Sequence, residues 1–323
     1  MLACALCVGA SPEPYLEATL ASIASVVDLL VVNDNAGDSI NSNIATITAS
    51  AIAKSGRLRI IQTTFVDFAT MRNDAFAALA ANATPDWVLW LDADEVHGDG
   101  LISLTRDLLP KLGSEYGSVD GYTDHFLGSF SWISDVARRF CTYRFDPQLR
   151  WKNPVHEKIE GLRGKALIVP YRYAHYGNVL PPELYAVKDR RYLALGNVVE
   201  YDPPAPEHAT LENIYRHKGK FARRFRGKHP SAARPLVERF TREWAGAFAE
   251  IDHIFAAEQT PLDRAANETR GLIEETRLRL RRLQHPRFVT PSGVVIPSEA
   301  PVVIPSEVPV VIPSEAPVVI PSE

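Results

Sequence analysis

Two aspartates one residue apart, Asp92 and Asp94, follow an apolar run in the segment VLWLDADEV, and Glu95 comes directly after them. Three carboxylates at the end of a buried strand repel one another unless a positive charge lies among them. Oxygen ligands at this spacing suit Mg²⁺ or Mn²⁺ when a diphosphate supplies further ligands. The segment therefore predicts a metal-assisted diphosphate site. The alternative is a turn of surface acids after a strand.

The elements before this segment alternate between strands and helices. We expect strands at 3–10, 28–34, 57–64 and 86–94, and helices at 14–25 and 67–83. Apolar strands separated by helices indicate a parallel, doubly wound α/β sheet, which binds ligands at the carboxyl ends of its strands. Asp34, Asp67 and the pair Asp92 and Asp94 are therefore expected to share one edge.

The chain divides into three parts. We predict one domain over residues 1–202, a helical region over 203–287 and a repeat tail over 288–323. Within the first part, residues of about 115–180 are short, aromatic and β-like, which predicts an antiparallel extension of the sheet, and 183–201 is expected to be helical. The tail repeats VVIPSE four times, and its regular prolines predict an extended, disordered segment.

The composition limits the classes to which the protein can belong. The 323 residues are 46% hydrophobic and carry a formal net charge of −4, so nothing in the overall charge predicts a nucleic-acid partner. Cys4 and Cys7 point to opposite faces of a predicted strand, which favours buried thiols over a metal or redox pair. Three cysteines without a disulfide framework indicate a cytoplasmic protein.

Four motifs in order carry a resemblance to a known family. LLVVNDNAGD, DFATMRNDAF and DWVLWLDADEV closely resemble family 2 glycosyltransferases of the GT-A fold. RRFCTYRFDPQLRWKNPVHEKI and a later His175-Tyr176 resemble the branch of bacterial lipopolysaccharide-core β-1,4-glucosyltransferases. The resemblance spans about residues 3–195 and departs from the usual pattern at 35–37. It implies a Rossmann-like GT-A domain with a mixed sheet that transfers a hexose, with inversion, from a nucleotide sugar.

The resemblance also implies a donor site. Its nucleotide-sugar residues are Ala10, Asp34, Asp67, Arg72, Asp92 and Ala93. Asp34 would accept a nucleobase N–H and so favour UDP, although a strand-end turn residue is the alternative. Arg72 would contact the diphosphate, or else simply pair with Asp67.

Mn²⁺ or Mg²⁺ is the cofactor that the resemblance implies. Asp94 would ligate the metal directly, and Asp92 would face the ribose or the water shell of the metal. His175 would complete the metal shell, unless it is a stacking or core histidine. The metal would stabilise the departing nucleoside diphosphate.

A carboxylate must deprotonate the acceptor in inverting transfer. Glu157 is the predicted base, with Asp120, Asp124 and Glu95 as alternatives, and His156 is expected to orient its loop. For the acceptor, whose identity the sequence leaves open, the candidates are Asp120, Trp132 and Trp151. The two tryptophans could offer flat faces to a sugar, although aromatic residues in short strands are usually core.

A basic run lies in the helical region. Its members are Arg216, Lys218, Lys220, Arg223, Arg224, Arg226 and Lys228. With Phe221 and Phe225 at i, i+4 they predict a cationic helix with one apolar stripe. Such a helix would either dock beside the active site and attract an anionic acceptor, or make peripheral contact with an anionic membrane. A solvated helix face is the third alternative.

Two other functions compete with glycosyl transfer. DADEV also matches the D-x-D-x-[TV] motif of haloacid-dehalogenase-type phosphatases, but no D-D or G-D-x-x-x-D pair follows Glu95 and the motif comes late in the chain. A degenerate GT-A domain could instead bind anionic surfaces or nucleic acid through residues 216–228. Because the carboxylates of the DADEV segment are intact, the sequence favours a glycosyltransferase over a degenerate binding domain.

Overall fold

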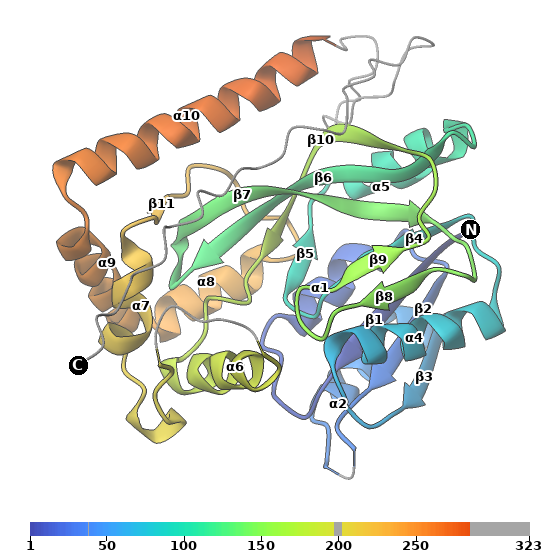
Figure 1. Cartoon of the computed structure of the whole chain (residues 1–323), viewed down its shortest axis with the longest axis horizontal. Helices are drawn as coiled ribbons and strands as arrows, with labels where there is room; N and C mark the ends of the chain where they lie inside the picture. The colour runs from blue at the N-terminus through green and yellow to red at the C-terminus, as the bar shows by residue number, and fades with distance from the viewer. Residues whose placement is uncertain (38, 197–201, 285–323) are drawn as a thin grey trace, which may run out of the picture.

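The computed structural model describes residues 1–37, 39–196 and 202–284, and one large sheet dominates it (Figure 1). Within these residues the sheet has nine strands in the order β3-β2-β1-β4-β7-β6-β10-β5, and β11 pairs with β7. The predicted repeat tail at 288–323 lies outside the described residues.

The amino-terminal half of the sheet is parallel, as predicted. Its strands are β1 (Leu2–Val8), β2 (Leu29–Asp34), β3 (Leu58–Gln62) and β4 (Trp87–Leu89). The intervening helices are α1 (Leu16–Ile23), α2 (Asn43–Ala49), α3 (Ala51–Lys54) and α4 (Phe68–Asn82). Parallel neighbours require such crossovers, and the carboxyl ends of these strands therefore lie at one edge.

The strand that leads to the aspartates is shorter than predicted. We expected it to span 86–94, but β4 ends at Leu89. Trp90 N still donates to Cys141 O at 2.9 Å, and Glu95 N then donates to Asp92 O at 3.1 Å, which closes a turn. The two aspartates therefore lie in a turn between β4 and β5 (Glu95–His97).

The predicted short strands of the extension join into longer ones. They are β6 (Tyr116–Leu127), β7 (Ser129–Arg144) and β10 (Lys165–His175). Gly128, with φ 70°, makes the tight turn between β6 and β7, which pair antiparallel. Our expectation of a wholly antiparallel extension is wrong, because β10 pairs in parallel with β6. A separate hairpin of β8 (Arg150–Lys152) and β9 (Lys158–Glu160) precedes β10.

Helices fill most of the remaining described chain. They are α5 (Leu101–Ser103), η1 (Leu104–Leu108), η2 (Leu109–Lys111), α6 (Pro182–Ala194), η3 (Pro206–His208), α7 (Leu211–Gly219), α8 (Arg234–Glu243), α9 (Ala245–Glu258) and α10 (Pro261–Gln284). The helix predicted at 183–201 corresponds to α6, and 197–201 lie outside the described residues. In Figure 1, α10 runs along the upper edge of the molecule, on the side away from β1, β2 and β3.

The basic run at 216–228 is not the single helix that we predicted. α7 ends at Gly219, and Arg223 and Arg224 form β11, which pairs antiparallel with Trp132 and Ile133 of β7. The unpaired backbone of β7 accounts for the difference, because strand pairing there satisfies backbone groups that a helix would leave exposed.

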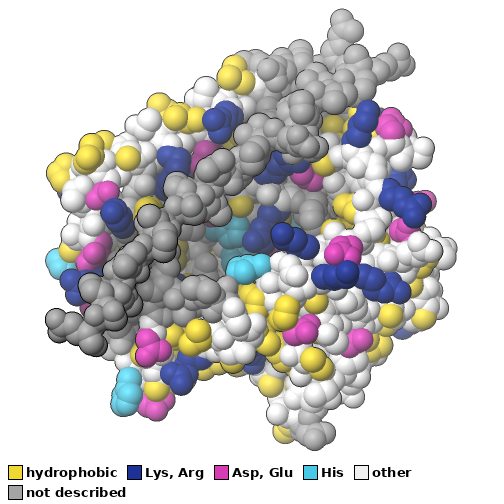
Figure 2. Space-filling view, viewed as in Figure 1, with side chains coloured by type: hydrophobic (Ala, Val, Ile, Leu, Met, Phe, Trp, Pro, Cys, Tyr) yellow, Lys and Arg dark blue, Asp and Glu magenta, His cyan; other side chains and the backbone are white. Residues whose placement is uncertain are grey.

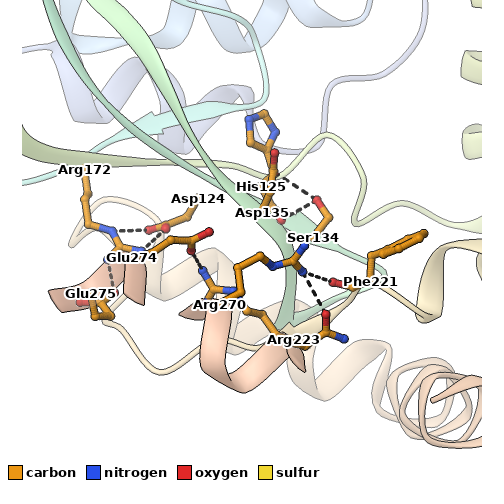
Figure 3. Close-up of polar contacts among 11 residues, drawn as sticks. Asp124, His125, Ser134, Asp135, Arg172, Phe221, Arg223, Arg270, Glu274 and Glu275 are labelled. Atoms are coloured by element: carbon orange, nitrogen blue, oxygen red, sulfur yellow. Dashed lines mark hydrogen bonds and ion pairs between the residues drawn. The ribbon is translucent and has the colours of Figure 1, made fainter. Parts of the chain in front are cut away.

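Most of the cations in β11 and beside it are paired with acids from later helices. Arg223 pairs with Glu274 (Figure 3), and Arg226 pairs with Glu268 at 2.6 Å. Phe225 packs on Phe126 with ring centroids 4.7 Å apart, whereas Phe221 is exposed. The run therefore ties the helices to the sheet and does not form the cationic helix predicted for an acceptor or a membrane.

None of the helices in the described ranges has the length and hydrophobicity needed to cross a bilayer. Two hydrophobic clusters join the sheet to the later helices. One packs Phe126 and Phe130 of the sheet against Leu236 and Phe240 of α8, and the other packs Trp132 against Phe255 of α9.

His97 provides a test of this core through its pH dependence. The ring is buried and stacks on Tyr171 and Tyr173, with Nδ1 2.8 Å from the Tyr171 hydroxyl. Burial lowers the pKa of His97 from 6.5 to about 4. Between these pH values only the unfolded state takes up the proton, so the free energy of unfolding falls as pH decreases, by up to about 3 kcal/mol.

Denaturant unfolding at pH 7.5 and pH 4.5 measures this loss. We expect His97→Gln to show a smaller difference between the two pH values than the natural chain. The exposed His208→Gln serves as the matched control and should keep the full difference. An unchanged pH dependence in His97→Gln would show that His97 does not contribute to it.

Candidate active site

The turn after β4 carries the three carboxylates of Asp92, Asp94 and Glu95. Figure 2 shows histidine, lysine and arginine side chains gathered near the middle of one face of the molecule. Glu95 turns inward and is fully buried, and its Oε2 accepts from Asp92 N at 3.2 Å. Burial, together with Asp92 and Asp94, raises the pKa of Glu95 well above its usual range, which favours its neutral form.

Arg72 of α4 joins Asp92 to Glu157. Its Nη2 donates to Asp92 Oδ1 at 2.6 Å, and its Nε donates to Glu157 Oε1 at 2.6 Å. The guanidinium also lies over the Trp90 ring, 4.2 Å from the centroid. Burial alone would raise the pKa of Asp92, but Arg72 lowers it below its usual range. Asp92 is therefore held as an anion by a fixed cation.

Asp94 faces a histidine and a lysine. His175 Nε2 lies 3.5 Å from Asp94 Oδ1, and Lys188 Nζ lies 3.8 Å from Asp94 Oδ2. Burial lowers the pKa of His175, which leaves its ring neutral at pH 7. Burial alone would also lower the pKa of Lys188, but Asp94 and other neighbours raise it. Only glycine fits at Gly177, because a Cβ there would come 2.0 Å from Asp94 Oδ2.

Asp94 and His175 fit a divalent cation. Two of their buried atoms, Asp94 Oδ1 and His175 Nδ1, have no hydrogen-bond partner. A cation about 2.0–2.2 Å from Asp94 Oδ1 would satisfy that oxygen, and the nearby His175 Nε2 could be its second ligand, which would leave His175 Nδ1 without a partner. Among the described residues no group of three or more His, Cys, Asp or Glu could hold a metal. A cation here would therefore keep positions open for the oxygens of a diphosphate.

The loop that carries Glu157 has an unusual backbone. Asn153 and His156 adopt φ values of 74° and 53°, in the left-handed region that costs non-glycine residues about 1 kcal/mol or more. The His156 ring lies 6.4 Å from that of Tyr192 on α6. Such strain often occurs at functional sites. That His156 orients this loop stays a prediction.

The other residues assigned to the donor lie in the loops at the same edge. Asp34 ends β2, and its Oδ1 accepts from Asn41 Nδ2 at 2.6 Å. Ala10 follows β1 and is exposed, and Ala93 O accepts from Thr19 Oγ1 at 2.9 Å.

Asp67 is the amino-terminal cap of α4. Its Oδ1 accepts from Thr70 N at 2.6 Å, a bond that satisfies one of the unpaired N–H groups of the first turn. The alternative pairing of Arg72 with Asp67 is therefore wrong, since Arg72 is held by Asp92 and Glu157.

The structure does not place Trp132 and Trp151 where a sugar could stack on them. Trp132 is buried, its Nε1 donates to Asp252 Oδ1 at 2.6 Å, and Arg224 covers its ring at 4.0 Å. Trp151 is buried against Phe76, with ring centroids 5.2 Å apart. The alternative, that both tryptophans belong to the core, is correct, because large aromatic side chains on strands are buried by the layers that cover the sheet.

Asp120 and Asp124 are neutralised by arginines. Arg138 Nε donates to Asp120 Oδ2 at 2.8 Å, and Arg172 holds Asp124 and also pairs with Glu275 of α10 (Figure 3). These contacts give both carboxylates structural partners. They weaken the case for either as the base and for Asp120 as an acceptor contact.

Sequence reasoning missed the contribution of α6. Lys188 and Arg191 lie at i, i+3 on this helix, and the Arg191 guanidinium lies 5.6 Å from the centroid of the Phe65 ring. Glu13, after β1, is half-buried, and its desolvation together with Asp94 raises its pKa to about 8 despite the opposing charge of Lys188. The signal available was a pair of basic residues on the helix that follows the His175-Tyr176 motif. The local sequence does not determine which side of that helix packs against the site.

Comparisons with known proteins agree with these motifs. The family model for Glycosyl transferase family 2 matches residues 7–162. No curated protein matches the chain.

Solved structures show weaker likeness. A mycobacterial protein is 16% identical with a TM-score of 0.28 over 40% of this chain and 43% of its own. Glucosyl-3-phosphoglycerate synthase from Mycobacterium tuberculosis, solved with Mn²⁺ and UDP, is 18% identical with a TM-score of 0.26 over 38% and 44%. Staphylococcus aureus TarS 1–349 in complex with UDP is 12% identical with a TM-score of 0.37 over 88% of both chains. The present chain thus spans less than half the length of the two mycobacterial chains.

Proposed function

We propose that this protein is an inverting hexosyltransferase that uses a UDP-linked donor and Mn²⁺ or Mg²⁺, a proposal supported by the match of residues 7–162 to the Glycosyl transferase family 2 model. The observation that supports the proposal most directly is that Asp92 and Asp94 have different neighbours. Arg72 fixes Asp92, whereas Asp94 keeps a buried oxygen without a hydrogen-bond partner beside His175 and Lys188. A fixed anion beside cations and a metal ligand suits a departing diphosphate.

The nucleoside is assigned to the ends of β1 and β2. Asp34 Oδ2 accepts one long bond, from Gln62 Nε2 at 3.3 Å, and is the oxygen that we assign to a uracil N–H. The ribose is assigned to Asp92, and the loops that contain Ala10, Asp67 and Ala93 would surround the nucleotide. These assignments follow from the shared edge of the parallel strands.

Cations of this chain would hold the leaving group. Lys188 of α6 lies beside Asp94, Arg191 of the same helix lies over the Phe65 ring, and Arg72 pairs with Asp92. A metal on Asp94 and His175 would neutralise charge that develops on the diphosphate. The three protein cations would orient the diphosphate by hydrogen bonds to its oxygens.

Glu157 is the proposed general base. Its Oε1 is occupied by Arg72, and we assign the proton of the acceptor hydroxyl to its other oxygen, Oε2. The hydroxyl oxygen would attack the anomeric carbon from the face opposite the diphosphate. As this C–O bond forms, the bond to the β-phosphate breaks and its electron pair leaves with the nucleoside diphosphate.

A metal-dependent donor screen tests the proposal. The full chain is incubated with UDP-, GDP- and dTDP-linked hexoses, with and without Mn²⁺, and both the melting temperature and the release of nucleoside diphosphate are measured. We expect a UDP-hexose plus Mn²⁺ to raise the melting temperature and to be slowly hydrolysed. Binding without hydrolysis or transfer would favour a degenerate binding domain, and no response to any donor would contradict the proposal.

The cellular setting is also a proposal. We place the reaction in the cytoplasm, because Cys4, Cys7 and Cys141 are all free thiols in the described chain. The proposed acceptor is a hydroxyl compound.

A further inference from the structure

The outer face of α10 carries large aliphatic side chains that nothing in the described chain covers. Leu262 is 80% exposed, Leu272 68%, Ile273 47% and Leu280 51%. At 100° per residue around the helix, Leu262, Ile273 and Leu280 lie within about 20° of one another and form a stripe. Leu272 lies about 80° to one side and widens this stripe. The stripe is about 27 Å long at 1.5 Å per residue. Figure 2 shows hydrophobic and basic side chains alternating along the edge that α10 forms.

The acids of α10 are held by partners inside the molecule. Glu274 pairs with Arg223 and Glu275 pairs with Arg172 (Figure 3), while Glu268 pairs with Arg226. The remaining acid, Asp263, accepts from Thr260 at the start of the helix. The negative charges of the three glutamates are therefore balanced by arginines, and Asp263 is hydrogen-bonded at the start of the helix.

One arginine that remains available to an anion flanks the stripe. Arg277 is exposed, has no ion-pair partner within the described residues, and follows Ile273 by four residues, which places it about 40° from Ile273 around the helix. In the sequence, Arg279, Arg281 and Arg282 follow in the last turns of α10, and no acid lies between 276 and 298. The carboxyl-terminal half of the stripe therefore lies in a basic stretch of the sequence.

We propose that the outer face of α10 is a docking surface for an anionic membrane. Aliphatic side chains would enter the boundary between headgroups and acyl chains, and the arginines would contact anionic headgroups. Thr269 suits such a face, because its hydroxyl already donates to Ala265 O at 2.8 Å. The contact is peripheral, and it involves a different element from the basic run at 216–228.

A second copy of the chain fits the same face less well. The positions in line with Leu262, Ile273 and Leu280 include Ala266, Thr269 and Thr276, which would make a weak seam between two helices. The unpaired arginines would also repel their counterparts across such a dimer. The charge of the surface therefore favours anionic lipid.

Vesicle flotation of the full chain tests the proposal. The probes are vesicles of phosphatidylcholine alone and of phosphatidylcholine with 30% phosphatidylglycerol, at low and high salt. We expect binding only to the anionic vesicles, and at least a tenfold loss of binding in Leu272→Glu with Ile273→Glu. Arg277→Glu should lower binding about fivefold or more as well, because each cation near the surface contributes.

The matched control is Ile102→Glu, which places the same charge at an exposed aliphatic residue of α5. It should keep full binding. Circular dichroism and light scattering of every variant monitor folding and oligomeric state. Equal binding by Leu272→Glu/Ile273→Glu and the natural chain would overturn the proposal. So would a dimer that these substitutions dissociate while no vesicle binding is seen.

Discussion

Asp94→Asn is expected to abolish metal-dependent turnover, with a loss of about 10³-fold or more. The substitution keeps the size of the side chain but removes the charge that would hold the cation against the diphosphate. It also removes the carboxylate that faces Lys188 at 3.8 Å and His175 at 3.5 Å. Release of UDP from a UDP-hexose measures turnover, and calorimetry with and without Mn²⁺ measures UDP affinity. The variant should lose both turnover and the effect of Mn²⁺ on UDP affinity.

Asp86→Asn is the matched control for this prediction. Asp86 precedes the amino end of β4, and its side chain is 70% exposed at the opposite end of the strand from Asp94. This variant should turn over normally. Undiminished turnover of the natural chain in chelator, or a Mn²⁺ response that survives in Asp94→Asn, would show that Asp94 does not hold the metal.

Glu157→Gln is expected to keep donor affinity and to lower transfer by about 10²-fold or more, the usual scale for a general base. Glutamine can still accept from Arg72 through its amide oxygen, so the contact between α4 and the loop is preserved. It cannot take up the proton of the acceptor hydroxyl. Steady-state kinetics on the donor that the screen identifies should show a fall in kcat with little change in KM.

Glu160→Gln controls for a change of charge nearby. Glu160 lies on β9, three residues from Glu157, and pairs on the surface with Lys152 at 2.7 Å. Its loss should have little effect on transfer. If Asp120→Asn or Asp124→Asn reproduces the kcat defect while Glu157→Gln turns over normally, the base has been assigned to the wrong residue.

The sequence by itself determined the parallel half of the fold and the edge at which the site lies. β1 and β2 were predictable because each is a local apolar run, and α4 because its sequence is rich in alanine. The carboxylates at 92 and 94 could be proposed as a site because acids one residue apart after an apolar strand repel one another unless a positive charge lies among them. The family 2 motifs gave the remaining candidates, since four of them occur in order.

The tertiary structure decided which side chains meet. Arg72 could pair with several acids, and only the position of the loop at 153–157 brings Glu157 to its Nε. Lys188 reaches Asp94 because α6 folds back over the edge, and the periodicity of a helix does not determine its partner. Arg223 looked like part of a cationic helix, yet strand pairing with β7 and an ion pair to α10 outweighed its local preference. Contacts between residues far apart in the chain depend on how the helices, loops and strands pack together. The local sequence pattern does not determine this packing.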